Sequence, residues 1–385
     1  MAISCCVLRD VASQLYNDDL VTLATLNWAI HYQVIPELKK RNFLHAFVEC
    51  DDLDTCIWIL TNTNFNIHEH AYIALEMAAI EGNIVLCKWL VDNCAELSVV
   101  GVPHFVSLAN AAVHGHLALC KWLVTHFKLT FDNVRHSALY QACFHGQLDV
   151  FKWFVEYFGL SSRGVDVALR EASDGGHLEM CKWIVSKFNI TVDDYLPIIV
   201  ESLGFAAKGG HLHICEWLVG YYGLTLDHVT MHYSEPIRYA AMGGNLDICK
   251  WFVDQFGIGI LNIGFDHGLM FVSMCHHLDI CQWFMFNCFK DAQEDRDRLY
   301  SMLLNAVGKG YLDVCQWLVS EYGITKEEIA RNNNALFFCA CRRGCLAPCR
   351  WLVVKFGLDR DAIRAAMDVC GHQTHVGQWL ARITS

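Results

Sequence analysis

The stretch from Gly175 to Asn189 reads Gly-Gly-His-Leu-Glu-Met-Cys-Lys-Trp-Ile-Val-Ser-Lys-Phe-Asn, and it decides the fold. In a helix, its polar side chains Glu179, Lys182 and Ser186–Lys187 fall on one narrow stripe, because they recur at steps of three and four residues. The rest of the helix surface is apolar. A helix that is apolar over most of its circumference needs a neighbour on each side, so this stretch predicts one member of a row of similar helices.

Copies of the stretch supply those neighbours. Close copies begin at Gly115, Gly210 and Gly244. Eleven tryptophans, 28 to 34 residues apart, mark the copies: Trp58, Trp89, Trp122, Trp153, Trp183, Trp217, Trp251, Trp283, Trp317, Trp351 and Trp379. A repeat of this length is typical of a solenoid. We therefore expect an all-α helical-repeat solenoid of about eleven repeats over residues 43–385, with a C-terminal cap at 361–385 and a small helical segment at 1–42.

Glycines punctuate each repeat. We expect one glycine after each first helix: Gly82, Gly115, Gly146, Gly176, Gly210, Gly244, Gly310 and Gly344. Another follows many second helices: Gly159, Gly223, Gly257, Gly323 and Gly357. The residue after a helix often adopts a left-handed conformation, which glycine tolerates best. Lys128 and Asn189 take the second place in two repeats, and the longest connections are expected at 224–236 and 290–298.

Composition limits the function classes. Of the 385 residues, 54% are hydrophobic, which suits a continuous core in which each repeat buries both faces. The formal net charge is −12, without a basic stripe, which argues against nucleic acid or an anionic membrane as a main partner. We find no apolar run long enough to span a membrane and no secretory signal, and expect the cytoplasm or nucleus as the location.

Cysteines recur at one place in the repeat, two residues before the tryptophan: Cys56, Cys87, Cys120, Cys181, Cys215, Cys249, Cys281, Cys315 and Cys349. Packed helices lie roughly 8–10 Å apart, whereas a disulfide needs Cα atoms closer than about 7 Å. Phe151 occupies this place in one repeat, which favours a packing role. We expect small buried side chains in a reducing compartment.

Two sequences have the ligand types of a zinc site, and each also has a simpler interpretation. They are Cys339-x-Cys341-x-x-x-Cys345-x-x-x-Cys349 and Cys370-Gly-His372-x-x-His375. A metal-dependent enzyme would need one of them, but Cys349 is the ordinary repeat cysteine and the second set offers only three ligands. No nucleophile motif, phosphate-binding loop or carboxylate pair stands out. We therefore expect no cofactor, no metal and no catalysis. His116, His177 and His211 recur after the turn glycine, and we interpret them as capping and turn residues.

The first 42 residues are expected to form three short helices and resemble an F-box. The residues that carry the resemblance are Leu8, Val11, Leu15, Leu20, Leu23, Leu26, Pro36 and Leu38. The chain has Ile3-Ser4 where the family usually has Leu-Pro, and Ile30 where it has tryptophan. An F-box implies that these residues bind the Skp-type adaptor of a cullin ubiquitin ligase. The alternative is an N-terminal cap for the solenoid.

The repeats resemble ankyrin repeats. The resemblance rests on Ala111-Ala112-Val113-His114-Gly115-His116-Leu117 and on Ser137-Ala138-Leu139-Tyr140-Gln141-Ala142, although the Asp-x-x-Gly hairpin of the standard repeat is missing. The Cys-Lys-Trp-Leu-Val form is most similar to ankyrin families encoded by large DNA viruses of amoebae. Ankyrin repeats imply protein partners on the concave face of the first helices. The residues expected there are His114, His145, Asp174, Lys208, Met242, Lys309, Arg342 and Arg343.

Together these observations favour a monomeric interaction protein. Our main hypothesis is an adaptor that recruits a substrate to a cullin-type ubiquitin ligase, with the target held in the ankyrin groove and the first 42 residues on the ligase. Proximity alone would supply the mechanism. If the protein is viral, the location is the host cytoplasm. The alternative is a binding or scaffold module that sequesters a host protein without any link to a ligase.

Overall fold

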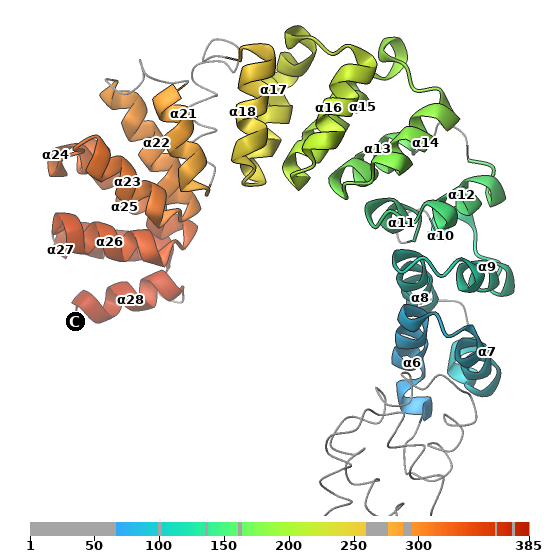
Figure 1. The fold of residues 1–385 in the computed structure, drawn as a ribbon. Helices are drawn as coiled ribbons and strands as arrows, with labels where there is room; N and C mark the ends of the chain where they lie inside the picture. Colours follow the sequence, from blue (N-terminus) through green and yellow to red (C-terminus); the bar gives the residue numbers. More distant parts are fainter. Residues whose placement is uncertain are drawn as a thin grey trace, which may run out of the picture. The chain divides into compact units, whose positions relative to one another are not determined.

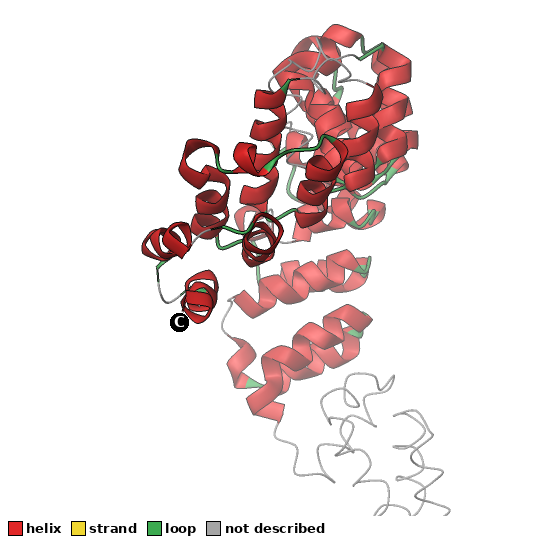
Figure 2. Cartoon of the chain, turned by 90° about the vertical axis from the view of Figure 1, so that its left-hand side faces the viewer, coloured by secondary structure: helices red, strands yellow, loops and turns green. Residues whose placement is uncertain are grey.

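A computed structural model describes residues 67–98, 102–134, 138–160, 164–258, 276–287, 295–358, 360–371 and 374–384. These residues form helices joined by turns and loops, with no strand among them (Figure 2). The expected all-α repeat fold is therefore confirmed. The F-box-like segment and the repeat around Trp58 lie outside the described residues. The chain divides into two compact units, Met1–Ile190 and Thr191–Ser385.

The described part of the first unit consists of helix pairs in two layers (Figure 1). Its first helices are α6 (Ile67–Glu81), α8 (Val102–Val113), α11 (Tyr140–Phe144) and α13 (Val165–Asp174). Its second helices are α7 (Ile84–Asn93), α9 (Leu117–His126), α12 (Leu148–Tyr157) and α14 (Leu178–Phe188). Two short elements are η1 (Ala95–Ser98) and α10 (Phe131–Val134). Each first helix packs against the next, α6 on α8, α8 on α11 and α11 on α13.

The second unit repeats the arrangement. Its first helices are α15 (Val192–Gly209), α17 (Leu226–Met242), α22 (Arg296–Lys309), α25 (Arg331–Arg343) and α27 (Arg360–Cys370). Its second helices are α16 (Leu212–Tyr222), α18 (Leu246–Phe256), α21 (Leu278–Asn287), α23 (Leu312–Glu321), α26 (Leu346–Phe356) and α28 (His375–Thr384). A short helix, α24 (Lys326–Ile329), precedes α25. Helix α15 packs on α17, while α22, α25 and α27 form a row beside the row of α21, α23, α26 and α28.

Helix α14 has the orientation that its sequence predicts. Met180, Cys181, Ile184 and Val185 are buried, and Glu179, Lys182, Ser186 and Lys187 are exposed. The cysteines at the same place in α7, α9, α16, α18, α21, α23 and α26 are also buried, and none forms a disulfide. Phe151, which takes this place in α12, is buried as well. The repeat cysteine is thus a packing residue of the core between the two layers.

The turn glycines adopt the expected conformation. Positive φ angles occur at all eight glycines after the first helices, between 72° at Gly82 and 87° at Gly310, and at the five after the second helices. Lys128 and Asn189 take the same conformation with φ of 50°. After each first helix, the residue that follows the glycine donates its N–H to an alanine carbonyl, as His116 does to Ala111 at 2.9 Å and Cys345 to Ala340 at 2.9 Å. Both glycine positions therefore serve to end a helix.

The side chain of the residue after the first-helix glycine reaches the preceding repeat, and we call this contact the inter-repeat bond. The donors and their carbonyl acceptors are His116 Nε2 to Ile80 (2.8 Å), Gln147 Nε2 to Val113 (2.8 Å), His177 Nε2 to Phe144 (3.0 Å), Asn245 Nδ2 to Lys208 (2.7 Å) and Cys345 Sγ to Gly308 (3.6 Å). Every acceptor residue lies two positions before its own turn glycine. Because a carbonyl oxygen only accepts, the two histidines carry their proton on Nε2.

This bond corrects the interpretation of the repeat histidines. His116, His177 and His211 occupy the N-cap positions of α9, α14 and α16, but none makes a side-chain cap hydrogen bond. His116 and His177 instead bind the neighbouring repeat. A histidine ring is long enough to reach the preceding first helix, where a carbonyl at the helix end needs a donor.

The two segments expected to be long connections both run into helices, which corrects the first expectation and agrees with reading the end of the second, 290–298, as an N-terminal helical turn. Residues 224–236 are mostly helical, because α17 already begins at Leu226 after its N-cap Thr225. Thr225 and His228 form a capping box, and Thr325 and Glu328 form another before α24. The described end of the second connection, Asp295–Arg298, is the first turn of α22, with the Asp295 carboxylate accepting from Arg298 N at 3.1 Å. A threonine followed three residues later by a polar residue marks the starts of α17 and α24, and an aspartate N-cap marks that of α22.

Alanine substitutions at Gly146 and Gly159, two glycines of one repeat, distinguish the cost of backbone strain from the cost of disturbing the inter-repeat bond. Both have positive φ, of 72° and 60°, so alanine at either site costs about 1–2 kcal/mol in strain. A Cβ on Gly146 would also lie 2.3 Å from Nδ1 of His177, whereas a Cβ on Gly159 meets nothing within 4 Å. We expect Gly146→Ala to lower the unfolding free energy by at least about 1 kcal/mol more than Gly159→Ala, measured by urea denaturation.

The double variants provide the control. In a His177→Ala background, Gly146→Ala should cost no more than Gly159→Ala, because the ring that collides with the new Cβ is gone. Equal costs of the two glycine variants in the wild-type background would contradict this account of the turn.

Candidate protein-binding surface

The eight residues predicted to line the concave face lie at the C-terminal ends of first helices. Each is within two residues of a turn glycine, as with His145 at the end of α11 and Lys309 at the end of α22. All are exposed except Asp174, which is half-buried. The sequence prediction therefore selects a single structural position in successive repeats, and the binding role of these residues remains a prediction.

The inter-repeat bond explains why side chains can vary at this edge. The acceptor position, two residues before the turn glycine, holds Ile80, Val113, Phe144, Asp174, Lys208, Met242, Gly308 and Arg342. The bond itself uses only the backbone carbonyl of this residue. The side chains at this position differ in burial: Ile80 and Val113 are half-buried, while Phe144 and Met242 are 36% and 51% exposed. Phe144 is a candidate contact that the sequence prediction missed.

The charge of this edge differs between the two units. In the first unit the predicted residues are His114, His145 and Asp174, and the ring of His114 contacts the Asn110 carbonyl at 2.9 Å. In the second unit they are mostly cations. Lys208 Nζ lies 5.4 Å from the ring centre of Phe205, while Lys309, Arg342 and Arg343 form no ion pair within the described residues. Cations at helix C-termini are favoured by the helix dipole, which accounts for part of this pattern.

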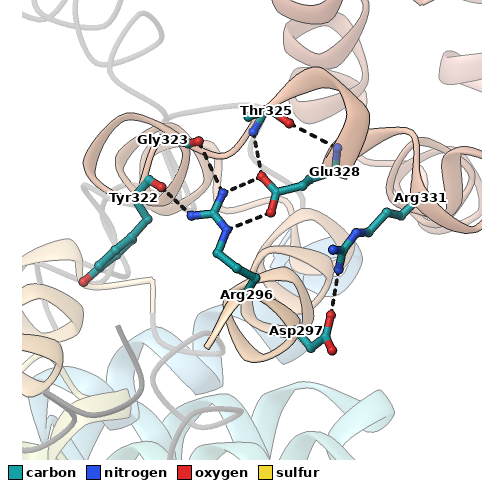
Figure 3. Close-up of polar contacts among 7 residues, drawn as sticks. All are labelled: Arg296, Asp297, Tyr322, Gly323, Thr325, Glu328 and Arg331. Carbon is teal, nitrogen blue, oxygen red and sulfur yellow. Dashed lines mark hydrogen bonds and ion pairs between the residues drawn. The ribbon is translucent and has the colours of Figure 1, made fainter. Parts of the chain in front are cut away.

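A polar network holds α22 and α25, the helices that carry these three cations (Figure 3). The Arg296 guanidinium donates to both carboxylate oxygens of Glu328, through Nε at 2.7 Å and through Nη2. It also donates to the carbonyls of Tyr322 at 2.6 Å and Gly323 at 3.3 Å. On the neighbouring turn, Arg331 pairs with Asp297 at 2.7 Å. Arg296 therefore fastens the start of α22 to the loop and short helix before α25.

The buried thiols of the repeats lack the low pKa that a nucleophilic cysteine needs. Burial raises the pKa of the Cys87, Cys120, Cys181, Cys215, Cys281 and Cys315 thiols to about 12. The hydrogen bond with Cys349, together with burial, raises the pKa of Cys341 as well. A thiol must lose its proton to attack or to bind a metal, so these groups are unreactive at neutral pH.

The two candidate zinc sequences are placed as follows. Sγ of Cys341 lies 3.7 Å from Sγ of Cys349, while Cys345 forms its inter-repeat bond to Gly308 and Cys339 is half-buried. His372 of the second sequence lies outside the described residues. Within the described part of the chain, no group of three or more His, Cys, Asp or Glu side chains could hold a metal ion. No helix there is both long and apolar enough to cross a membrane.

The Arg296–Glu328 contact predicts an acid-dependent stability. The hydrogen bond from Arg296 holds the pKa of Glu328 at about 2, well below its ordinary value of 4.5. A lowered carboxyl pKa contributes stability above the ordinary value, and this contribution is lost as the pH falls from 4.5 toward about 2. Glu328→Gln should lower the unfolding free energy by about 1 kcal/mol at pH 7 and by less at acid pH, measured by urea denaturation. Glu321→Gln on α23 is the control, and a pH-independent effect of Glu328→Gln would contradict the assignment.

Comparison with known proteins supports the repeat assignment. A family model for ankyrin repeats, with three copies, matches residues 108–195, a stretch that contains α9 to α14. No curated protein matches the chain. Ankyrin repeats are typically non-enzymatic and indicate a protein–protein interaction module, and they imply protein partners for this chain.

Proposed function

We propose that the protein is an adaptor that brings a target protein to a cullin-type ubiquitin ligase, with the target on the C-terminal edge of the first helices. The observation that carries the target-binding half is the acceptor position of the inter-repeat bond. The repeats keep its backbone carbonyl for the fold, while its side chain ranges from Val113 to Phe144 to Lys208. A surface that changes while its scaffold stays constant is suited to a specific partner.

The ligase half rests on the resemblance of residues 1–42 to an F-box. Leu8, Leu20 and Leu23 are among the apolar residues that would contact the Skp-type subunit. In this mechanism the chain performs no chemistry. It raises the effective concentration of the target near the ligase, which requires only that both contacts are made at once. Buried thiols of high pKa fit a role without a nucleophile.

The cationic edge of the second unit favours a target with an acidic segment. Lys309, Arg342 and Arg343 lie at the ends of adjacent helices, and the Cys345 to Gly308 contact at 3.6 Å brings the two turns together. Opposite charge speeds encounter and rejects wrong partners more than it adds affinity. We therefore expect the on-rate for the target to depend on salt concentration.

The ligase half is tested by binding of purified Skp-type adaptor to the full-length chain. We expect capture by the wild type and loss of capture with Leu20→Asp, because a carboxylate cannot be buried in an apolar contact without a large cost. Lys39→Glu, in the same segment, is the matched control and should still bind. If the wild type fails to bind, the adaptor role is excluded, and the protein acts as an interaction module that sequesters its partner.

The target-binding half is tested by proximity labelling with the full-length chain in cells. Proteins labelled by the wild type should be lost with the double variant Arg342→Glu/Arg343→Glu, because the edge then repels an acidic segment. The control is Lys187→Glu on the exposed stripe of α14, which should label the same proteins as the wild type. Identical labelling by all three would place the target on another surface.

A further inference from the structure

The exposed stripe of α26 departs from the pattern that the other second helices share. Three residues after the repeat tryptophan, most second helices carry a polar residue or glycine: Asp92, Thr125, Glu156, Ser186, Gly220, Asp254 and Ser320. In α26 this residue is Val354, which is 83% exposed. Phe286 of α21, 44% exposed, is the other apolar residue at this place among the described repeats. Val354 lines the same groove as Leu346 and Trp351 and is therefore part of a contiguous apolar surface.

The same helix lacks the ion pair found on α14 and α18. Four residues before the tryptophan, α14 and α18 carry an acid, and these acids pair with lysines in Glu179–Lys182 at 2.8 Å and Asp247–Lys250 at 3.4 Å. In α26 this residue is Ala347, and α9 likewise has an alanine, Ala118, at this place. Arg350 therefore has no carboxylate on its own helix, and its guanidinium lies 5.8 Å from the ring centre of Trp379.

Beside Val354 lies an apolar groove that also contains two cationic side chains, Arg350 and Lys355. A groove of about 760 Å³ between α23 and α26 is lined by Leu312, Leu346, Ala347, Arg350, Trp351, Val354 and Lys355. Its lining contains no carboxylate, and neither Arg350 nor Lys355 forms an ion pair within the described residues. A second groove of about 780 Å³ shares Trp351 and Lys355 with it. Both volumes are within the range of sites that accept ligand side chains.

We propose that this groove binds an acidic amphipathic segment of a partner protein. Apolar side chains of the segment cover Val354 and Leu346, and its carboxylates meet Arg350 and Lys355. Helices with one apolar face use grooves of this kind as docking sites. The contact lies on the second helices, so it does not depend on the proposed role of the first-helix edge.

The charges around the groove favour a protein segment over a membrane surface. A flat anionic bilayer would also meet the exposed acids of α23, Asp313 and Glu321, which it would repel. A narrow segment can lie along α26 and avoid them. The whole chain has a net charge of −12, so the two unpaired cations are a local feature.

Peptide display on the full-length chain tests the proposal. A random dodecapeptide library is selected on the wild type and counter-selected on the double variant Ala347→Asp/Val354→Ser. That variant introduces the residue types that α18 and α14 carry at these places, Asp247 and Ser186, so we expect it to remain folded, checked by its thermal melt. The selected peptides should combine leucine, isoleucine or phenylalanine with several aspartates or glutamates.

Affinities of the best peptide, measured by fluorescence anisotropy, then separate the alternatives. Arg350→Glu should weaken binding about tenfold or more, whereas Lys121→Glu, at the same place in α9, should leave it unchanged. Selected peptides without acids, or equal binding to the double variant, would overturn the proposal. It would also be overturned if phosphatidylserine vesicles bind the wild type and not Val354→Ser, or if the wild type dimerises through this groove in light scattering.

Discussion

The repeats are held in register by one recurring hydrogen bond between neighbours. The residue after the turn glycine donates through its side chain to a carbonyl at the end of the preceding first helix, as His177 does to Phe144. The same residue closes its own helix through its backbone N–H, which bonds Ala172 at 3.0 Å. One residue thus ends its own helix through its N–H and donates a hydrogen bond to a carbonyl at the end of another helix. The glycine after the acceptor helix is also needed, because a Cβ on Gly146 would collide with the ring of His177.

In this arrangement, the groups that stabilise the fold differ from the exposed side chains that a partner could contact. The bond uses the backbone of the acceptor residue, and the core uses alanines, the repeat cysteine and the apolar side chains around it. The bond does not depend on the side chain at the acceptor position, which is exposed at Phe144 and Lys208. The exposed stripe of the second helices is likewise free to change, and α26 uses that freedom at Ala347 and Val354. Both proposed binding surfaces lie at places where the repeat makes no structural demand on the side chain.

Much of the fold could be predicted from the sequence, because its signals are local. Apolar spacing identified the second helices, and positive φ at Lys128 and Asn189 followed from their alignment with glycines. The role of the histidines could not be predicted, since His116 and Ile80 are 36 residues apart and their contact depends on how repeats stack. The Thr225–His228 and Thr325–Glu328 capping boxes were visible in the sequence but unrecognised. The edge residues could be chosen by their distance from the turn glycines, and their binding role stays a prediction, whereas the α26 groove requires the packing of two helices.

The thiol of Cys345 affects how firmly its repeat is joined to the preceding one. A thiol is a weak donor, and its contact with the Gly308 carbonyl is 3.6 Å long, against 2.7 Å for the amide of Asn245 on Lys208. Arg296, which reaches Glu328 and two carbonyls, spans the same pair of repeats and offsets the weaker contact. A charged pair near the surface therefore supplements the weak thiol contact between these two repeats. Because salt screens charges, this contact depends on ionic strength more than the neutral donors at the other turns do.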